Sequence, residues 1–425
     1  MLRLLWGAAL LVTPLFTLSL IVGHGVNVPI TDEWSLVPMF AEWDAGTLSL
    51  GDLVRQHHEH VPVFPRTADL LMAPLTDWDL RVAMYRNFAV ALVAFALILR
   101  ALRRTLDGAA FAVAAVVASL LAFSPIQWEN WTWGWQLEWF LSNLAALGAF
   151  YALAYRVDES PRRGLALAGA AGVVATFSLG QGLLVWPVGL VILLLRRRPW
   201  RAWTALGVTV YALYFADWDN PPESGDKTSA FELPGRTLEF VLAYVGRPLG
   251  NSAATGRAVA VVLVVAFAVA AYAVLRRGDE ALLRRASVWL ALGLYVLGAA
   301  VITAIARVPG SSGVESRYSV MSSLFAIAVM ALAYLVAPWR REVVVAAVAV
   351  PLLVAGAVNA RAGADALRER TAGYELYARC LHTVRSPDEV CAEASGKVNP
   401  AALHGEIVRA WPHLGYLRRK GWAGF

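Results

Sequence analysis

The chain has 425 residues, of which 58% are hydrophobic and only 16% are charged. A water-facing shell could not cover so much apolar surface, so the composition excludes a single soluble domain and requires lipid as the solvent for much of the chain. The net charge of +6 comes from short basic clusters between apolar runs, and this pattern argues against a nucleic-acid partner.

About 20 apolar residues are needed to cross a hydrocarbon core roughly 30 Å thick. The first apolar run, residues 5–23, is long for a signal peptide and lacks a small-x-small cleavage site, so we expect an uncleaved membrane helix. Further candidate spans lie at residues 83–99, 109–127, 140–155, 164–179, 182–195, 201–216, 258–275, 287–306, 319–338 and 342–359. The sequence therefore predicts an all-α polytopic membrane protein with about eleven transmembrane helices.

The segment 164–195 contains two apolar runs on either side of Gly180-Gln181-Gly182. It is too long for one straight helix and short for two. A single helix would place Arg162 and Arg196 on opposite sides of the membrane and would reverse every later loop. The charge pattern therefore favours two short or tilted spans.

Arginines cluster in alternate, short connections of the chain. The clusters are Arg100/Arg103/Arg104, Arg156/Arg162/Arg163, Arg196/Arg197/Arg198/Arg201, Arg276/Arg277/Arg284/Arg285 and Arg340/Arg341. The positive-inside rule makes these loops cytoplasmic, which places the N-terminus inside and the C-terminus outside a bacterial inner or plasma membrane. The excess of arginine over lysine is typical of a GC-rich bacterium.

The remaining connections are long enough to hold a functional site and amphipathic helices. They are residues 24–82, 128–139, 217–257, 307–318 and the tail 360–425. We divide the chain into a transmembrane domain, 1–360, whose outer loop 24–82 carries the candidate active site, and a small extracytoplasmic cap, 361–425. Cys380 and Cys391 both lie in this cap, on the oxidising side, where a disulfide between them is favoured.

The sharpest local feature is the pair Asp32 and Glu33, which follows the first span by about nine residues. Two adjacent carboxylates at a membrane surface are costly unless they are solvated, paired or used, so one of them is a candidate general base. The structural alternative is that Thr31 or Asp32 caps a helix that runs to Glu42. Both interpretations can hold, because a cap fixes the position of its carboxylate.

Three of the seven histidines lie together in the stretch from Gln56 to Arg66. Imidazole and carboxylate are suitable metal ligands, although the spacing is not that of the zinc-protease helix. We favour a pocket for phosphate or sugar hydroxyls, and a metal site or a solvated surface remain as alternatives. The candidate binding residues are His57, His58, Glu59 and Arg66.

Two further outer segments suit a sugar phosphate. In residues 126–139, five tryptophans alternate with polar side chains, which favours a carbohydrate groove, although an aromatic belt explains the tryptophans equally well. In residues 310–318, a guanidinium beside the membrane can grip a phosphate or serve only as an anchor. The candidates from these segments are Trp128, Glu129, Trp133, Glu315, Arg317 and Tyr318.

Together these features resemble the GT-C superfamily of integral-membrane glycosyltransferases, which use polyprenyl-phosphate-linked sugars. The resemblance implies that Asp32 is the catalytic carboxylate, with Glu33 as the alternative, and that Arg317 meets the lipid phosphate. It implies inverting transfer of a sugar to an extracytoplasmic glycan, glycolipid or protein. The cluster from His57 to His60 departs from the general family pattern, and it leaves a divalent cation, Mg²⁺ or Mn²⁺, as an open possibility.

Two other classes of protein are compatible with these features. A transporter or flippase for lipid-linked saccharides would also use aromatic grooves and interfacial arginines, but it should place ionisable residues in mid-membrane. The predicted spans carry few such residues. A non-catalytic partner in envelope assembly is the third possibility.

Overall fold

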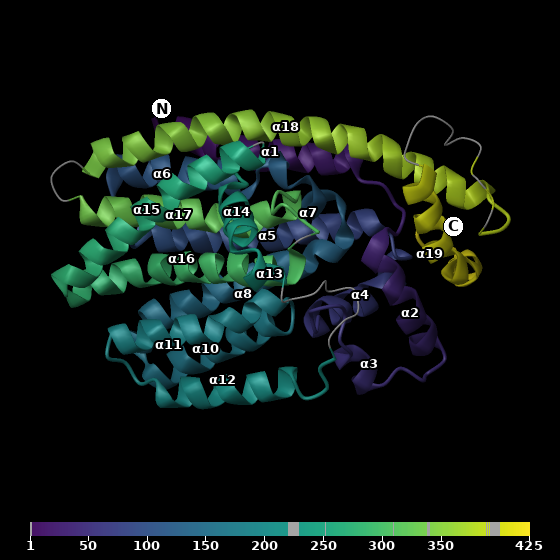
Figure 1. Cartoon of the computed structure of the whole chain (residues 1–425), viewed down its shortest axis with the longest axis horizontal. Helices are drawn as coiled ribbons and strands as arrows, with labels where there is room; N and C mark the ends of the chain where they lie inside the picture. The colour runs from purple at the N-terminus through teal and green to yellow at the C-terminus, as the bar shows by residue number, and fades with distance from the viewer. Residues whose placement is uncertain are drawn as a thin grey trace.

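The computed structural model describes residues 2–219, 229–250, 252–308, 310–337, 341–387, 389, 391 and 400–425. Within these ranges the helices are joined by turns and loops, and the β-structure is an isolated bridge between His57 and His60. Most of the helices run along one common direction, and the C-terminal helix closes one end of the bundle (Figure 1). The expectation of an all-α protein is confirmed.

The helices occupy the following ranges. The α-helices are α1 (Leu2–His24), α2 (Leu36–Asp44), α3 (Leu50–Val54), α4 (Val63–Thr76), α5 (Leu80–Arg103), α6 (Gly108–Ala122), α7 (Trp128–Thr132), α8 (Leu137–Tyr151), α9 (Val157–Glu159), α10 (Pro161–Thr176), α11 (Val185–Leu195), α12 (Arg201–Tyr214), α13 (Ser229–Glu232), α14 (Pro234–Gly246), α15 (Ala253–Arg277), α16 (Glu280–Arg307), α17 (Ser319–Val336), α18 (Arg341–Thr383) and α19 (Pro400–Lys420). Short helices of other types are η1 (Thr31–Ser35), η2 (Pro125–Gln127), η3 (Gly134–Gln136), η4 (Ala152–Arg156), η5 (Gly180–Leu184) and η6 (Ser316–Tyr318).

Eight helices of the described residues are long and apolar enough to cross a membrane. They are Trp6–His24, Leu80–Arg103, Gly108–Thr132, Gly134–Glu159, Ala253–Arg277, Glu280–Arg307, Ser316–Val336 and Glu342–Thr383. The chain is therefore consistent with a multi-pass membrane protein. The other three expected spans, near residues 164–179, 182–195 and 201–216, are helices of only 16, 11 and 14 residues.

The segment 164–195 is divided into two helices, as its charge pattern predicts. Helix α10 ends at Thr176, and α11 starts at Val185 after the short helix η5. Gly182 lies against the backbone of Ala175, so closely that a methyl group at position 182 would overlap it. The glycine therefore allows the chain to reverse tightly between the two helices.

Ion pairs bring the basic connections together at one end of the bundle. Asp158 binds Arg196 at 2.7 Å and Arg284 at 3.0 Å, and its neighbour Glu159 lies 4.0 Å from Arg104. The turns between α11 and α12 and between α15 and α16 lie at the end of the molecule opposite α19 (Figure 1). This grouping is what alternating basic loops require. Arg340 lies outside the described residues, as do residues 220–228 of the expected outer loop 217–257.

Helix α18 is continuous over 43 residues. The expected span 342–359 and the first part of the cap, to Thr383, are thus parts of one helix, and the division at residue 360 falls inside it. The sequence around this point is rich in alanine, a strong helix former, and has no proline.

The cap has its own apolar core at the end of the bundle. Side chains from α18 and α19 pack there against the outer loop, including Trp34 and Phe40, and the C-terminal Trp422 meets Phe40 edge to face at 5.5 Å. The predicted disulfide between Cys380 and Cys391 is confirmed, with Cα atoms 5.6 Å apart. The cap is therefore packed directly on the segment that carries the acid pair.

Candidate functional site

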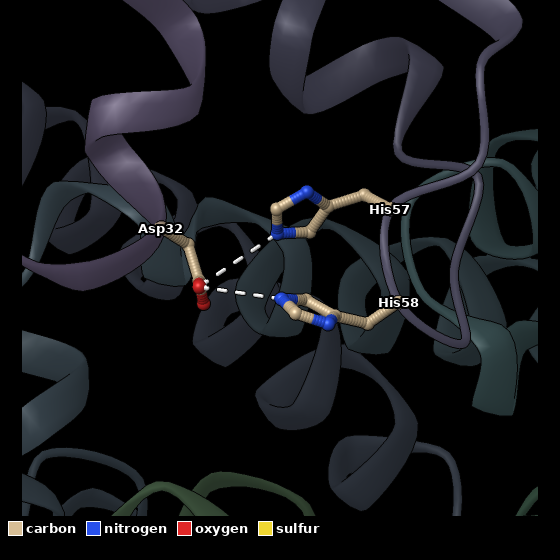
Figure 2. A group of neighbouring side chains, drawn as sticks. All are labelled: Asp32, His57 and His58. Carbon is tan, nitrogen blue, oxygen red and sulfur yellow. Dashed lines mark ion pairs between the residues drawn. The ribbon is translucent and has the colours of Figure 1, made fainter. Parts of the chain in front are cut away.

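The histidine cluster is held in a tight hairpin. The backbones of His57 and His60 exchange two hydrogen bonds, of 2.8 and 2.9 Å, across a turn formed by His58 and Glu59. His58 adopts a φ of +49°, a left-handed conformation that few residues other than glycine tolerate. This turn directs His57 and His58 towards Asp32 (Figure 2).

Asp32 lies in η1, which is anchored by its neighbour Glu33. Glu33 is only 2% exposed, and its carboxylate accepts hydrogen bonds from the backbone N–H of Ile30 at 2.9 Å and of Trp135 at 3.2 Å. Burial raises the pKa of Glu33 to about 8. The expected helix after the acid pair is present as η1 and α2, but its first turn is capped through Glu33, and the expectation of a Thr31 or Asp32 cap is wrong.

Asp32 and the two histidines form one compact group. The Nε2 atoms of His57 and His58 lie 3.8 and 3.6 Å from the same oxygen, Oδ1 of Asp32 (Figure 2). Burial disfavours the charged carboxylate, but its interactions with the two imidazoles outweigh burial and hold the pKa of Asp32 well below its ordinary value. One ligand atom from each residue lies within 4.8 Å of the others, a spacing that could hold a metal ion.

This group opens into a cavity of about 540 Å³. Its walls come from the hairpin, the tryptophan segment, the ends of α12 and α16, and α19. Among the lining residues are Asp32, His57, His58, Glu59, His60, Trp133, Trp135, Gln136, Glu138, Gln181, Leu183, Tyr214, Trp218, Ile302, Arg307, Arg317, Tyr318 and Arg409. Predicted residues from three separate loop segments therefore meet around one space.

Two carboxylates hold Arg317 and Arg307, two of the three arginines that line this cavity. Glu129 binds the guanidinium of Arg317 at 3.0 Å and also accepts the backbone N–H of Arg317 at 3.0 Å. Glu59 of the hairpin binds Arg307 at 3.0 Å. Each cation is thus fixed beside the cavity before any ligand arrives.

Five predicted residues do not line this cavity. Glu33 is buried against backbone, and Glu129 lies behind Arg317. Arg66 donates to the backbone carbonyls of Leu53 and Arg55, so it secures the connection between α3 and α4. The other two are Trp128, which lines a second cavity beside α18, and Glu315, which pairs with Ser311.

Other residues of the cavity were missed by the sequence analysis. His60 accepts the backbone N–H of Gly180 through Nδ1 at 3.2 Å and so joins the hairpin to η5. Desolvation lowers the pKa of His60 to about 3, in agreement with this acceptor role. Arg307 directly follows a predicted span and Arg409 lies in the tail, and no local pattern links either residue to the histidines.

Besides Thr31 Oγ1 and His57 Nε2, four further side chains of the cavity have a buried polar atom that lacks a hydrogen-bond partner among the described residues. These atoms are Trp133 Nε1, Gln136 Oε1, Glu138 Oε2 and Gln181 Oε1. A buried polar atom without a partner costs free energy, so such atoms favour a ligand that can pair with them. Together they offer both donors and acceptors.

The fold and the cavity define a polytopic helical membrane protein with a polar, aromatic pocket at one end of the bundle. A scan against protein-family models and searches of curated proteins and of solved structures found no match to the chain.

Proposed function

We propose that this protein is a membrane glycosyltransferase of the GT-C type, which moves a sugar from a polyprenyl-phosphate donor to an extracytoplasmic acceptor. The acceptor is a glycan, glycolipid or protein of the cell envelope. In this proposal the cavity faces outward, and the N-terminus and the basic connections face the cytoplasm. A lipid-linked donor suits an outward site, because nucleotide sugars are not available there.

The observation that carries the proposal is the convergence of Asp32, the histidine hairpin and Arg317 around one cavity. His57 and Arg317 follow Asp32 by about 25 and 285 residues in the sequence. Their proximity in the structure therefore comes from the fold and not from neighbouring positions in the chain. The convergence supplies a carboxylate for the acceptor hydroxyl and cations for the phosphate within reach of one substrate.

The cavity has a cationic part and an apolar part, which fit the phosphate and the prenyl chain of such a donor. Arg307 and Arg317 provide guanidinium groups, which bind phosphate through charge-assisted hydrogen bonds. Leu183, Ile302 and Phe215 provide an apolar side on which a prenyl chain can lie. The tryptophans and the unpaired polar atoms suit a sugar ring, which stacks on indole and bonds through its hydroxyls.

In the proposed reaction, Asp32 accepts the proton of an acceptor hydroxyl as its oxygen attacks the anomeric carbon. The bond between that carbon and the phosphate oxygen breaks on the opposite face, and the bonding electrons leave with the lipid phosphate. Arg317, held by Glu129, compensates the charge that develops on the leaving group. One carboxylate and one phosphate-binding cation are sufficient for this inverting displacement.

The proposal is tested with purified protein and a panel of polyprenyl-phosphate sugars. We expect wild-type protein to release lipid phosphate from one donor, and Asp32→Asn to reduce the rate about 100- to 10,000-fold, as for loss of a general base. Asp365→Asn is the matched control, because this exposed carboxylate lies outside the cavity and pairs with Arg368 in the cap.

Tryptophan fluorescence and size-exclusion chromatography establish whether each variant remains folded. If folded wild-type protein released lipid phosphate from none of the donors, or if Asp32→Asn retained full activity, the enzyme proposal would be rejected. Donor translocation across vesicles without phosphate release would identify the protein as a flippase instead.

A further inference from the structure

We propose that Asp32, His57 and His58 bind one first-row divalent transition-metal ion, with zinc as the best match, and leave a coordination position open to the cavity. The inference concerns these three side chains and does not depend on the reaction proposed above. It rests on their separations, their chemistry and the packing that holds them in place.

The distances within the group of Asp32, His57 and His58 are close to those of a zinc site. The separations of 3.6 and 3.8 Å between the imidazole Nε2 atoms and Asp32 Oδ1 are longer than an ordinary hydrogen bond. A tetrahedral zinc ion with bonds of about 2.1 Å holds its ligand atoms roughly 3.4 Å apart. Both separations from Asp32 thus lie within about 0.4 Å of those in a loaded zinc site.

The nitrogen atoms that face Asp32 are placed as metal ligands would be. His57 Nε2 is buried and has no hydrogen-bond partner among the described residues. The two Nε2 atoms face one carboxylate oxygen from neighbouring residues of a single tight turn, and the rings stand at 75° to each other, 4.5 Å apart. A cation at the point where these three atoms converge would give the buried His57 Nε2 the partner that it lacks.

The surrounding structure fixes the three ligand residues before a cation binds. The ring of His57 packs on Trp135 at 4.8 Å, and the backbone N–H of Trp135 is held by Glu33. On the other side, Glu406 of α19 accepts the backbone N–H of Thr31 at 3.3 Å. Such supporting contacts are typical of metal sites, where they orient the ligands.

Ligand type and number favour zinc over magnesium. Two imidazoles and one carboxylate suit first-row transition metals, whereas Mg²⁺ and Ca²⁺ prefer oxygen ligands. Three protein ligands leave the fourth position of a tetrahedral zinc ion free, as in catalytic zinc sites. Since all three residues line the cavity, that position faces the space where a phosphate or hydroxyl group would bind.

The test measures metal binding directly. Tag-free, chelator-stripped protein in detergent is titrated with Zn²⁺ by calorimetry, and bound metal is counted by mass spectrometry after desalting. Co²⁺ serves as a second probe, because its visible absorption reports tetrahedral imidazole ligation. We expect one Zn²⁺ per chain, no displacement by excess Mg²⁺, and affinity lowered at least about tenfold in His57→Ala and in His58→Gln.

His382→Ala is the matched control, because His382 lies in α18, outside the cavity, with its ring against Phe425. It should bind Zn²⁺ as the wild-type protein does. His58→Gln keeps a polar side chain at a partly exposed position and covers the case in which His57→Ala does not fold. The inference is overturned if folded wild-type protein binds no Zn²⁺, or if both folded histidine variants bind it with unchanged affinity. Neither result depends on glycosyl transfer, so the two proposals fail separately.

Discussion

Two residues in or next to the group of Asp32, His57 and His58 have a strained backbone conformation. Thr31, directly before Asp32, has a φ of +45°, and His58 has a φ of +49°. Left-handed backbone is unfavourable for such residues, above all for a β-branched threonine, and it persists only where the surrounding structure imposes it. Hairpin hydrogen bonds impose it on His58, and the anchoring of η1 by Glu33 and Glu406 imposes it on Thr31.

His60 should make the stability of the folded chain decrease at acidic pH. The folded chain keeps His60 neutral down to about pH 3, whereas in the unfolded chain it takes a proton near pH 6.5. Since the pKa of His60 is lower in the folded chain, the contribution of neutral His60 to the free energy of unfolding is fully present above pH 6.5. It is lost as the pH falls below 6.5, by at most about 1.4 kcal/mol per pH unit.

Replacement by His60→Asn keeps an acceptor for the Gly180 N–H and removes the titration. We therefore expect the melting temperature of the variant to fall less steeply than that of the wild-type protein between about pH 6.5 and pH 5. Thermal unfolding followed by tryptophan fluorescence in detergent measures both curves. Parallel curves for the two proteins would contradict the prediction.

Adjacent residues of similar chemistry have opposite environments in this site. Asp32 and Glu33 are neighbours in the sequence, yet Asp32 faces the cavity and Glu33 is buried against backbone. The sequence favours a functional carboxylate here and ranks Asp32 first only through a family resemblance. The direction of each side chain is set by the fold of η1 on the tryptophan segment, which no local pattern encodes.

At the scale of elements, η5 connects the histidine hairpin to the bundle. Its first residue, Gly180, donates to His60, and Gly182 packs on the backbone of Ala175. The turn between α10 and α11 is thus part of the site's framework. Charge alternation in the sequence predicts the turn, but not its contact with the hairpin.

The turn provides a steric test. Gly182→Ala places a methyl group against the backbone of Ala175, and overpacking of this kind costs about 1–3 kcal/mol. Gly235→Ala is the matched control, because nothing lies within 4 Å of a methyl group at that position. Melting temperatures of the two variants should therefore differ clearly, with Gly235→Ala at or above the wild-type value. Equal values for both variants would exclude the close contact.

At the scale of the whole molecule, the cap and the outer loop form one packed unit. The core that unites them includes residues as distant as Trp34 and Leu414. Glu406 and Arg409 of α19 connect this unit to the backbone of Thr31 and to the cavity. The cap therefore affects the geometry of the site from outside the membrane spans.

The disulfide should stabilise this arrangement. It closes a loop with a sequence separation of 11 residues, for which chain-entropy estimates give about 2–3 kcal/mol. We expect Cys380→Ser combined with Cys391→Ser, or reduction with dithiothreitol, to make α19 more sensitive to limited proteolysis while the membrane helices stay protected. Unchanged proteolysis of α19 in the double variant would show that packing alone holds the cap.

The sequence by itself determined that the chain is a multi-pass helical membrane protein, where most of its long apolar helices lie, and which loop segments contribute residues to the cavity. Apolar length and charge alternation are local properties, so they can be read without the fold. Only the tertiary structure decided that α18 runs unbroken into the cap, and that Asp32, His57 and His58 meet while Arg66 and Trp128 lie elsewhere. Those outcomes depend on long-range packing between segments, for which no short stretch of sequence contains the information.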